Sequence, residues 1–223
     1  DGVYKSFTFL DDERIFINYN TRAVFAYIRA AEALLHTLPL GVSHSVTFDL
    51  LVAARDALRD VNRFNDELFA KLDTDRFFYC VRPYYKPHKV GLREYRGANA
   101  GDFAGINVID LLLGLCRADD PYYSQLLVDK FLFMRPEDQL VLRDCMRRKS
   151  LLDSFLTASR RVARRCPCCS NLCVNWPTCA PPRHAMTSRR VIVTCKKSAR
   201  RWADQLIRSS SASQSVCRIF SRA

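Results

Sequence analysis

The sequence predicts an all-α protein, and three observations lead to this prediction. Apolar residues recur at helical spacing along most of the chain, and no segment alternates apolar and polar residues convincingly at a period of two. Proline, glycine and aspartate separate these segments, where they end or begin helices. With 223 residues the chain is long enough to bury a core of its own.

Two long helices are expected first. Residues 1–13 are predicted to be a loop or a short extended lead-in, and Asn20 and Thr21 offer a cap for a helix that ends at residues 39–41. Ser45 or Thr47 would cap the second helix. Its apolar residues form one stripe, with Arg/Asp pairs on the opposite face: Leu50, Leu51, Ala54, Leu58, Val61, Phe64, Leu68 and Phe69.

The remaining elements follow the same rules. Residues 75–85 are predicted to be helical until Pro87 stops them. Residues 105–116 are apolar nearly all round, which is typical of a helix buried between others. Pro121 and Pro136 each lie near the first turn of a further helix, and a last helix begins near Leu151.

The basic charge divides the chain into two parts. Residues 160–223 contain 14 Lys and Arg against one acid, Asp204, which leaves 21 bases and 22 acids in residues 1–159. The first part is therefore near neutral, without the basic excess of a nucleic-acid-binding domain. We predict a helical domain over residues 1–159, followed by a basic tail rich in Cys, Ser and Arg over residues 160–223.

Three interpretations of the tail stay open. Its seven cysteines and His184 suggest zinc, although their spacings fit none of the standard paired motifs. A disordered basic tail could bind nucleic acid or acidic lipid. The third interpretation is an out-of-frame translation of a GC-rich gene, since the tail lacks Gly, Glu and Tyr and is rich in Arg, Ser and Cys.

The near-neutral part has the character of a cytoplasmic protein. Cys80, Cys116 and Cys145 are scattered, which predicts reduced core thiols. No basic-then-apolar leader is present, and Asp110 interrupts the longest apolar run. We therefore expect neither a membrane nor a nucleic-acid partner for this part, and dimerisation stays open.

An aromatic segment with one arginine is the candidate binding site. Five aromatic residues lie within nine positions and give a large apolar surface with a few polar tips: Phe77, Phe78, Tyr79, Tyr84 and Tyr85. Arg82 is the one fixed charge among them, and a guanidinium can bind a carboxylate through two parallel hydrogen bonds. The alternative is an arginine that only stacks on neighbouring tyrosines.

Two features beside this segment extend the candidate site. Residues 97–101 form a loop of Gly, Ala and Asn whose glycines allow close backbone approach to a ligand, although an ordinary surface loop also needs them. His88 follows Pro87, and a histidine there could transfer a proton near neutral pH. The alternative is an exposed loop histidine.

These residues carry a resemblance to a known family. FFYCVRPYY, residues 77–85, resembles the Phe-Phe-x-x-x-Arg segment of the indoleamine 2,3-dioxygenase family. ANAGDFAGINVIDLLLGL, residues 98–115, is similar without a gap to that family's Gly-Ser-Ala-Gly loop and Leu-Leu-Gly helix. KSFTFLDDE, residues 5–13, resembles the corresponding segment of monodechloroaminopyrrolnitrin synthase, a bacterial relative in this histidine-ligated haem superfamily. The likeness covers about residues 1–160.

The resemblance implies a helical haem-dependent oxygenase of aromatic amino acids, with haem b on a histidine and dioxygen or hydrogen peroxide as oxidant. Phe77 and Phe78 would pack near the aromatic substrate and Arg82 would bind its carboxylate. Asn99, Ala100 and Gly101 would line the rim, and His88 would handle a proton. The equivalent of the first long helix lies on the distal side of the haem in relatives, which draws attention to three of its residues: Asn20, Arg22 and Phe25.

The setting of the iron ligand departs from the family's pattern. In the family the ligating histidine lies some tens of residues beyond the Leu-Leu-Gly helix, where this chain has His184. The surrounding Pro-Pro-Arg-His-Ala-Met-Thr-Ser is not the expected amphipathic helix. Either His184 holds the iron, or the authentic ligand is absent and the domain over residues 1–159 is incomplete at its C-terminal end.

Three functions follow from these alternatives. The segment VRPYYKPHKVG and the short chain favour the L-tyrosine 3-hydroxylases of antibiotic pathways, as in lincomycin biosynthesis, which make L-DOPA. A second possibility is the rearrangement of a chlorinated tryptophan, as in monodechloroaminopyrrolnitrin synthase. The third is a non-enzymatic helical protein whose basic tail binds zinc or nucleic acid.

Overall fold

The computed structural model describes residues 5–95, 97 and 103–165, and they confirm the all-α class. The long helices come first, and a series of shorter elements follows. In chain order the elements are α1 (Asp11–Leu40), α2 (Ser45–Lys71), α3 (Thr74–Arg76), the π-helix η1 (Phe77–Val81), the 3₁₀-helix η2 (Arg82–Tyr85), the strands β1 (His88–Val90) and β2 (Arg93–Tyr95), α4 (Ala104–Leu113), α5 (Pro121–Phe131), α6 (Pro136–Arg147) and α7 (Leu151–Arg165).

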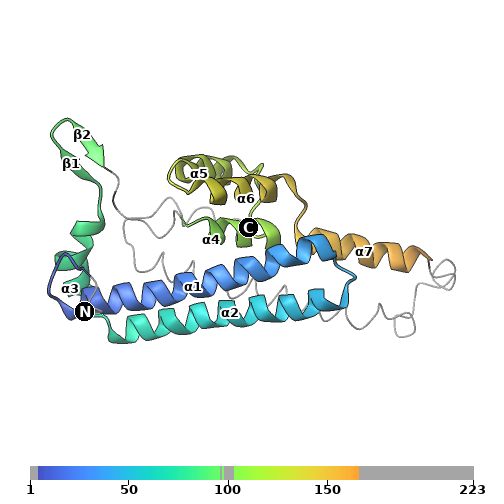
Figure 1. The fold of residues 1–223 in the computed structure, drawn as a ribbon, viewed down its shortest axis with the longest axis horizontal. Helices are drawn as coiled ribbons and strands as arrows, with labels where there is room; N and C mark the ends of the chain where they lie inside the picture. Colours follow the sequence, from blue (N-terminus) through green and yellow to red (C-terminus); the bar gives the residue numbers. More distant parts are fainter. Residues whose placement is uncertain (1–4, 96, 98–102, 166–223) are drawn as a thin grey trace.

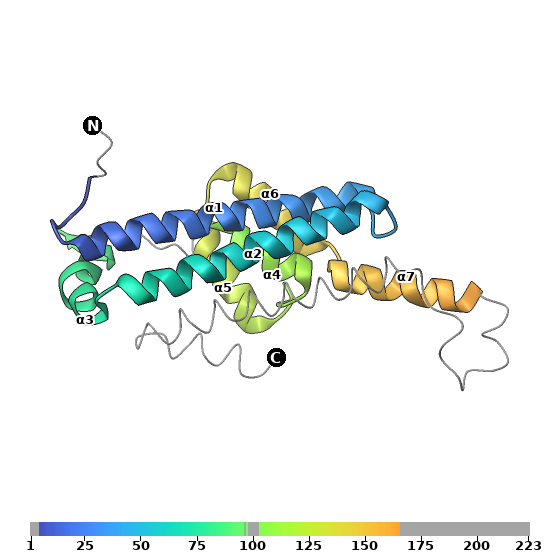
Figure 2. The same cartoon turned by 90° about the horizontal axis from the view of Figure 1, so that it is seen from below.

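The helices form two layers. Helices α1 and α2 lie side by side and run in opposite directions, joined by a short turn after Leu40 (Figures 1 and 2). Helices α4, α5 and α6 form a smaller second layer on one side of this pair, and α7 extends past it (Figure 1). Helix α4 connects the layers because it contacts α1, α6 and α7.

The main core fills the space between the layers. Leu34 of α1, Leu58 of α2 and Leu112 of α4 have at most 1% of their surface exposed. The middle of the predicted apolar stripe of α2 faces this core, with Leu51, Leu58 and Val61 buried in it, whereas Leu68 lies in a second core and Leu50 and Phe69 are only half-buried. Helix α4 is buried along most of its length, as its composition indicated. Hydrophobic burial between the pair and α4 therefore sets the position of the segments that lead into α4.

A second, smaller core lies at the opposite end of the α1–α2 pair. Five buried residues form it, drawn from the start of α1, the end of α2 and the aromatic segment: Tyr19, Leu68, Leu72, Phe77 and Val81. This cluster fixes the aromatic segment against the end of the helix pair, where Figure 1 shows it.

Helix α1 begins earlier than predicted. It starts at Asp11, and no side chain caps it, so the cap predicted at Asn20 or Thr21 is wrong, as is the loop predicted for residues 11–13. Asp11, Asp12 and Glu13 form its first turn, where carboxylates interact favourably with the helix dipole. Ser45 begins α2, but His44 caps it, because Nδ1 of His44 accepts a hydrogen bond of 3.2 Å from the Val46 amide.

A short β-hairpin departs from the all-helical expectation. Strands β1 and β2 pair antiparallel, with His88 opposite Tyr95 and Val90 opposite Arg93. Gly91 and Leu92 form the two-residue turn, and only Gly91 has a positive φ, +61°, which is the sign pattern of a type II′ turn. All six strand residues are exposed, so the hairpin stands away from the helices (Figure 1).

The cysteines, the membrane-spanning potential of the helices and the domain boundary were also predicted from the sequence. Cys80, Cys116 and Cys145 are free thiols, but only Cys145 is buried, and Cys80 is exposed, so the prediction of a core thiol is wrong for Cys80. Along the described residues, no helix is both long and apolar enough to cross a membrane. The domain boundary at residue 160 stays a prediction, since α7 continues to Arg165 and residues 166–223 lie outside the described residues.

Candidate functional site

The aromatic segment is built from three helical turns of different type. Asp73 caps α3 by accepting a hydrogen bond of 3.0 Å from the Arg76 amide. The chain then widens into the π-helix η1 and tightens into the 3₁₀-helix η2, which ends at Tyr85 as Pro87 predicted. Short π-helical turns are uncommon and occur often at functional sites. The change of pitch places Arg82 at the junction of the two turns.

Phe77 and Phe78 contact each other but lie in different surroundings. Their rings are 6.0 Å apart and nearly perpendicular. Phe77 is 6% exposed and its ring lies 4.7 Å from that of Phe16, so it belongs to the smaller core. Phe78 is half-buried at the edge of that core. Of the pair, Phe78 is therefore the ring with surface left for a ligand.

Arg82 lies at the start of η2 and is half-buried. Among the residues that the structure describes, no carboxylate pairs with its guanidinium, and none of their aromatic rings lies beneath it. The stacked-arginine alternative thus finds no support in this part of the chain. A half-buried guanidinium without a carboxylate is suited to an anionic ligand.

His88 lies next to the aromatic segment, on the exposed strand β1. Its Nε2 is 3.0 Å from the carbonyl oxygen of Tyr84, so the ring is held at the end of η2. The structure thus places a titratable group beside the segment, and the predicted proton transfer by His88 stays a prediction.

Gly97, the first residue of the loop that was predicted to form the rim, lies against the end of the aromatic segment. A Cβ atom on Gly97 would lie 2.1 Å from the carbonyl oxygen of Tyr85 and 2.6 Å from the carbonyl carbon of Lys86. Only glycine allows this close approach of two backbones. The rim residues predicted next, Asn99, Ala100 and Gly101, lie outside the described residues.

The sequence reasoning missed two buried carboxylates beside this segment. Asp12 is 2% exposed and accepts hydrogen bonds from the Asp73 amide, at 3.0 Å, and from the Arg76 guanidinium. Glu13 is fully buried and accepts bonds from Thr8 and from the Tyr85 hydroxyl, the latter at 3.4 Å. The acidic run at residues 11–13 was the available signal, but its partners are distant in sequence.

The charges of these carboxylates follow from their hydrogen bonds. The Arg76 guanidinium lowers the pKa of Asp12 despite its burial. Burial acts to raise the pKa of Glu13, but hydrogen bonds from the Thr8 hydroxyl, the Phe7 and Thr8 amides and Tyr85 together lower it. Burial and the Glu13 carboxylate raise the pKa of Tyr85 to about 12, so this phenol stays a donor.

Of the three residues of α1 that the resemblance highlighted, one lies over a residue of the smaller core. Asn20 is half-buried. Arg22 is exposed, with its guanidinium 5.5 Å from the centre of the Tyr19 ring. Phe25 is 63% exposed. None of them contacts Phe78 or Arg82 through an interaction among the described residues.

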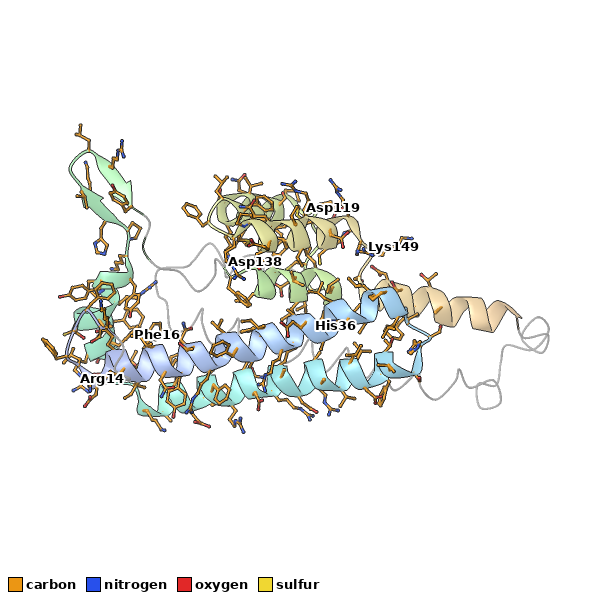
Figure 3. The ribbon with its side chains drawn as sticks, in the orientation of Figure 1. Arg14, Phe16, His36, Asp119, Asp138 and Lys149 are labelled. Carbon is orange, nitrogen blue, oxygen red and sulfur yellow. The ribbon has the colours of Figure 1, made fainter. Side chains whose placement is uncertain are left out.

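The described histidines do not fit the iron-ligand part of a haem site. His36, His44 and His88 are all exposed, whereas an axial ligand lies in the pocket that holds the macrocycle. Figure 3 shows His36 far along α1 from Phe16, and 20 helical residues span roughly 30 Å. No group of three metal-binding side chains occurs in the described part of the chain. The predicted ligand His184 lies outside the described residues.

Comparison with known proteins identifies the family to which the chain belongs. Among curated proteins, none matches the chain significantly. The family model described as monodechloroaminopyrrolnitrin synthase PrnB matches residues 1–170, which include every described element. This family is one of haem-dependent oxygenases of the indoleamine 2,3-dioxygenase type, as residues 77–85 and 98–115 indicated. The chain belongs to the monodechloroaminopyrrolnitrin synthase PrnB family.

Proposed function

We propose that this member of the family acts on a free aromatic amino acid, and that the reaction is the 3-hydroxylation of L-tyrosine to L-DOPA in antibiotic biosynthesis. The observation that carries the proposal is the half-buried Arg82, which has no carboxylate partner among the described residues. A site for an amino acid needs one fixed positive charge for the carboxylate and an apolar surface for the ring.

Different residues would bind the carboxylate, the aromatic ring and the ammonium group of the substrate. Arg82 binds the carboxylate, and the exposed part of Phe78 contacts the aromatic ring of the substrate, while Phe77 supports Phe78 from the core. Asn99, Ala100 and Gly101 line the rim and offer backbone groups to the substrate ammonium. Gly97 supports this placement, because it joins the rim to the end of the aromatic segment.

The cofactor belongs to the same proposal. Haem b would supply the oxygen chemistry when bound, with dioxygen or hydrogen peroxide as oxidant, and His184 would hold its iron. Because the Tyr84 carbonyl can only accept, Nε2 of His88 donates to it, and Nδ1 would be the atom that exchanges a proton with the substrate phenol. The 3.0 Å contact of Nε2 with the Tyr84 carbonyl supports a defined ring orientation for His88.

The rearrangement of a chlorinated tryptophan is the second candidate. The family match favours it, since the family takes its description from an enzyme of that reaction. Arg82 would bind the carboxylate of either amino acid equally well. The two candidates differ in the ring that must fit against Phe78, a phenol or a larger chlorinated indole.

Reconstitution with haemin separates these possibilities. The full chain is titrated with haemin to obtain a histidine-haem Soret band, and then with L-tyrosine or with a chlorinated L-tryptophan. A Soret shift with tyrosine, together with L-DOPA formed from tyrosine and an oxidant, supports the hydroxylase. A shift and turnover with the chlorinated tryptophan alone would overturn it in favour of the rearrangement. His184→Ala should abolish the band, and an unchanged band would remove His184 from the proposal.

A further inference from the structure

Two adjacent carboxylates at the start of α1 contact the two ends of the aromatic segment. Asp12 and Glu13 are 2% and 0% exposed, although ionised side chains are seldom fully buried without partners. Asp11, the preceding residue, is exposed. The first turn of α1 therefore carries two buried acids and one exposed acid of the same type as Asp12.

Asp12 holds the beginning of the segment. Its Oδ1 accepts a hydrogen bond of 3.0 Å from the Asp73 amide, and its Oδ2 binds Nε of Arg76. Asp73 caps α3, and Arg76 directly precedes Phe77. The Asp12 carboxylate thus holds both Asp73, which caps α3, and Arg76, the last residue of α3 before η1 begins.

Glu13 holds the end of the segment. Its Oε1 accepts bonds of 2.8 Å from the Phe7 amide and 3.4 Å from the Tyr85 hydroxyl. Its Oε2 accepts two bonds of 2.6 Å from the amide and hydroxyl of Thr8. The Phe7 ring, held in this way, stacks on Tyr84 at 5.6 Å with an angle of 10°. Glu13 therefore supports both tyrosines that close η2.

Between these two ends, Phe77 and Val81 hold the segment in the smaller core, but the segment's own hydrogen bonds give it little support. A single π-helical turn and a single 3₁₀ turn have poorer hydrogen-bond geometry than an α-helix, so contacts outside the segment must hold their pitch. Arg82 lies at the junction between them. A change of pitch at either end would therefore change the direction of its guanidinium.

We propose that Asp12 and Glu13 are positioning residues that set the direction of Arg82 and thereby the affinity of the site for the carboxylate of its substrate. This inference rests on the proposed function, in which Arg82 binds that carboxylate. The carboxylates act through the backbone and through Tyr85, and neither of them contacts the substrate.

Two measurements on the full chain test this role. The first is hydrogen–deuterium exchange of peptides that cover residues 77–85, which depends on neither haem nor substrate. The second is calorimetric titration of the haemin-loaded protein with L-tyrosine and with tyramine, which lacks the carboxylate. The variants are Asp12→Asn and Glu13→Gln, with Asp11→Asn as the matched control and Arg82→Met as the reference.

The expected results are specific to the carboxylate. Asp12→Asn and Glu13→Gln should speed exchange in residues 77–85 and weaken tyrosine binding about tenfold, with tyramine binding changed less than about twofold. Asp11→Asn removes an exposed charge near Arg76 without removing a hydrogen bond to the segment, so it should change both measurements much less than Asp12→Asn does. Tyr85→Phe removes only the hydroxyl group that binds Glu13, so we expect a smaller change in both measurements. This variant tests the role of Glu13 if Glu13→Gln does not fold.

The failure of this inference differs from the failure of the proposed function. If Arg82→Met removes the preference for tyrosine over tyramine while Asp12→Asn, Glu13→Gln and Tyr85→Phe retain it, the positioning role is refuted and the proposed function stands. If Arg82→Met also retains the preference, Arg82 does not bind the carboxylate and the proposed function fails. Equal weakening of tyrosine and tyramine by the variants would indicate a general structural role and would also refute the inference.

Discussion

The hydroxyl group of Tyr123 donates a hydrogen bond of 3.4 Å to Oδ2 of Asp110 and joins α5 to the carboxylate of α4. Nδ2 of Asn107 donates to the same phenolic oxygen at 3.1 Å. Oδ1 of Asn107 is buried without a hydrogen-bond partner among the described residues. Burial raises the pKa of Asp110 to about 7, and the bond from Tyr123 only partly offsets this.

The raised pKa of this half-buried acid predicts a stability that depends on pH. The pKa of Asp110 is higher in the folded chain than in the unfolded chain, so the folded chain retains the proton longer. The free energy of unfolding should therefore fall by up to about 4 kcal/mol as the pH rises from about 4 to about 7. Asp110→Asn removes this loss, so chemical denaturation should show the variant to be more stable than the parent at pH 8.

The comparison with the parent isolates Asp110. The lowered pKa values of Asp12 and Glu13 act in the opposite direction, since their stabilisation is lost as the pH falls, but both proteins contain them. Asp49→Asn changes an exposed acid and should leave the pH profile unaltered. A difference between Asp110→Asn and the parent that is the same at pH 5 and pH 8 would contradict the prediction.

The two phenylalanines should respond differently to truncation. Phe77 is buried against Phe16, so Phe77→Ala should lower the free energy of unfolding by about 3–5 kcal/mol. Phe78→Ala should lower it by less than about 2 kcal/mol, because this side chain is only half-buried. Denaturation with urea measures both values, and equal losses would contradict the assignment of Phe77 to the core.

Ligand binding gives the complementary comparison for Phe78. Its exposed part is proposed to contact the aromatic ring, so Phe78→Ala should weaken the binding of tyrosine and of tyramine alike, by about 1 kcal/mol. Titration calorimetry of a variant that remains folded measures this loss. Unchanged binding of both ligands would show that the aromatic ring of the substrate does not contact Phe78.

Gly97 is predicted to be more sensitive to substitution than Gly91. Gly97→Ala would bring a Cβ within 2.1 Å of the Tyr85 carbonyl, so the end of η2 or the rim loop must move. Gly91→Ala meets no atom within 4 Å and should cost only about 1 kcal/mol, because of its positive φ. Tyrosine binding should fall for Gly97→Ala and stay the same for Gly91→Ala. Equal binding by both variants would contradict a rim joined to the aromatic segment.

The sequence predicted the helices because their signals are local. The apolar stripe of α2, the nearly continuous apolar surface of α4 and the prolines that begin α5 and α6 each act within a few residues. The hairpin at residues 88–95 was missed, because three exposed residues per strand give no apolar alternation. The start of α1 was missed because Asn20 and Thr21 resemble a cap, whereas Asp11 begins the helix without one.

The candidate site was predictable only in part for a similar reason. Phe78 and Arg82 could be identified from the composition of one short segment. The roles of Asp12 and Glu13 depend on Arg76 and Tyr85, which are 64 and 72 residues further along the chain. No periodicity in the sequence indicates such pairs, and only the folding of α1 against α2 brings them together.

The most direct test of the central claim is the affinity of Arg82→Met for L-tyrosine and for tyramine, measured by calorimetry on the full haemin-loaded chain. The matched control is Arg93→Met, which removes an exposed arginine of the hairpin. We predict that Arg82→Met weakens tyrosine binding by about 2 kcal/mol or more, with tyramine binding retained and the control unchanged. Equal affinity of Arg82→Met and the parent for tyrosine would contradict the assignment of Arg82 as the carboxylate anchor.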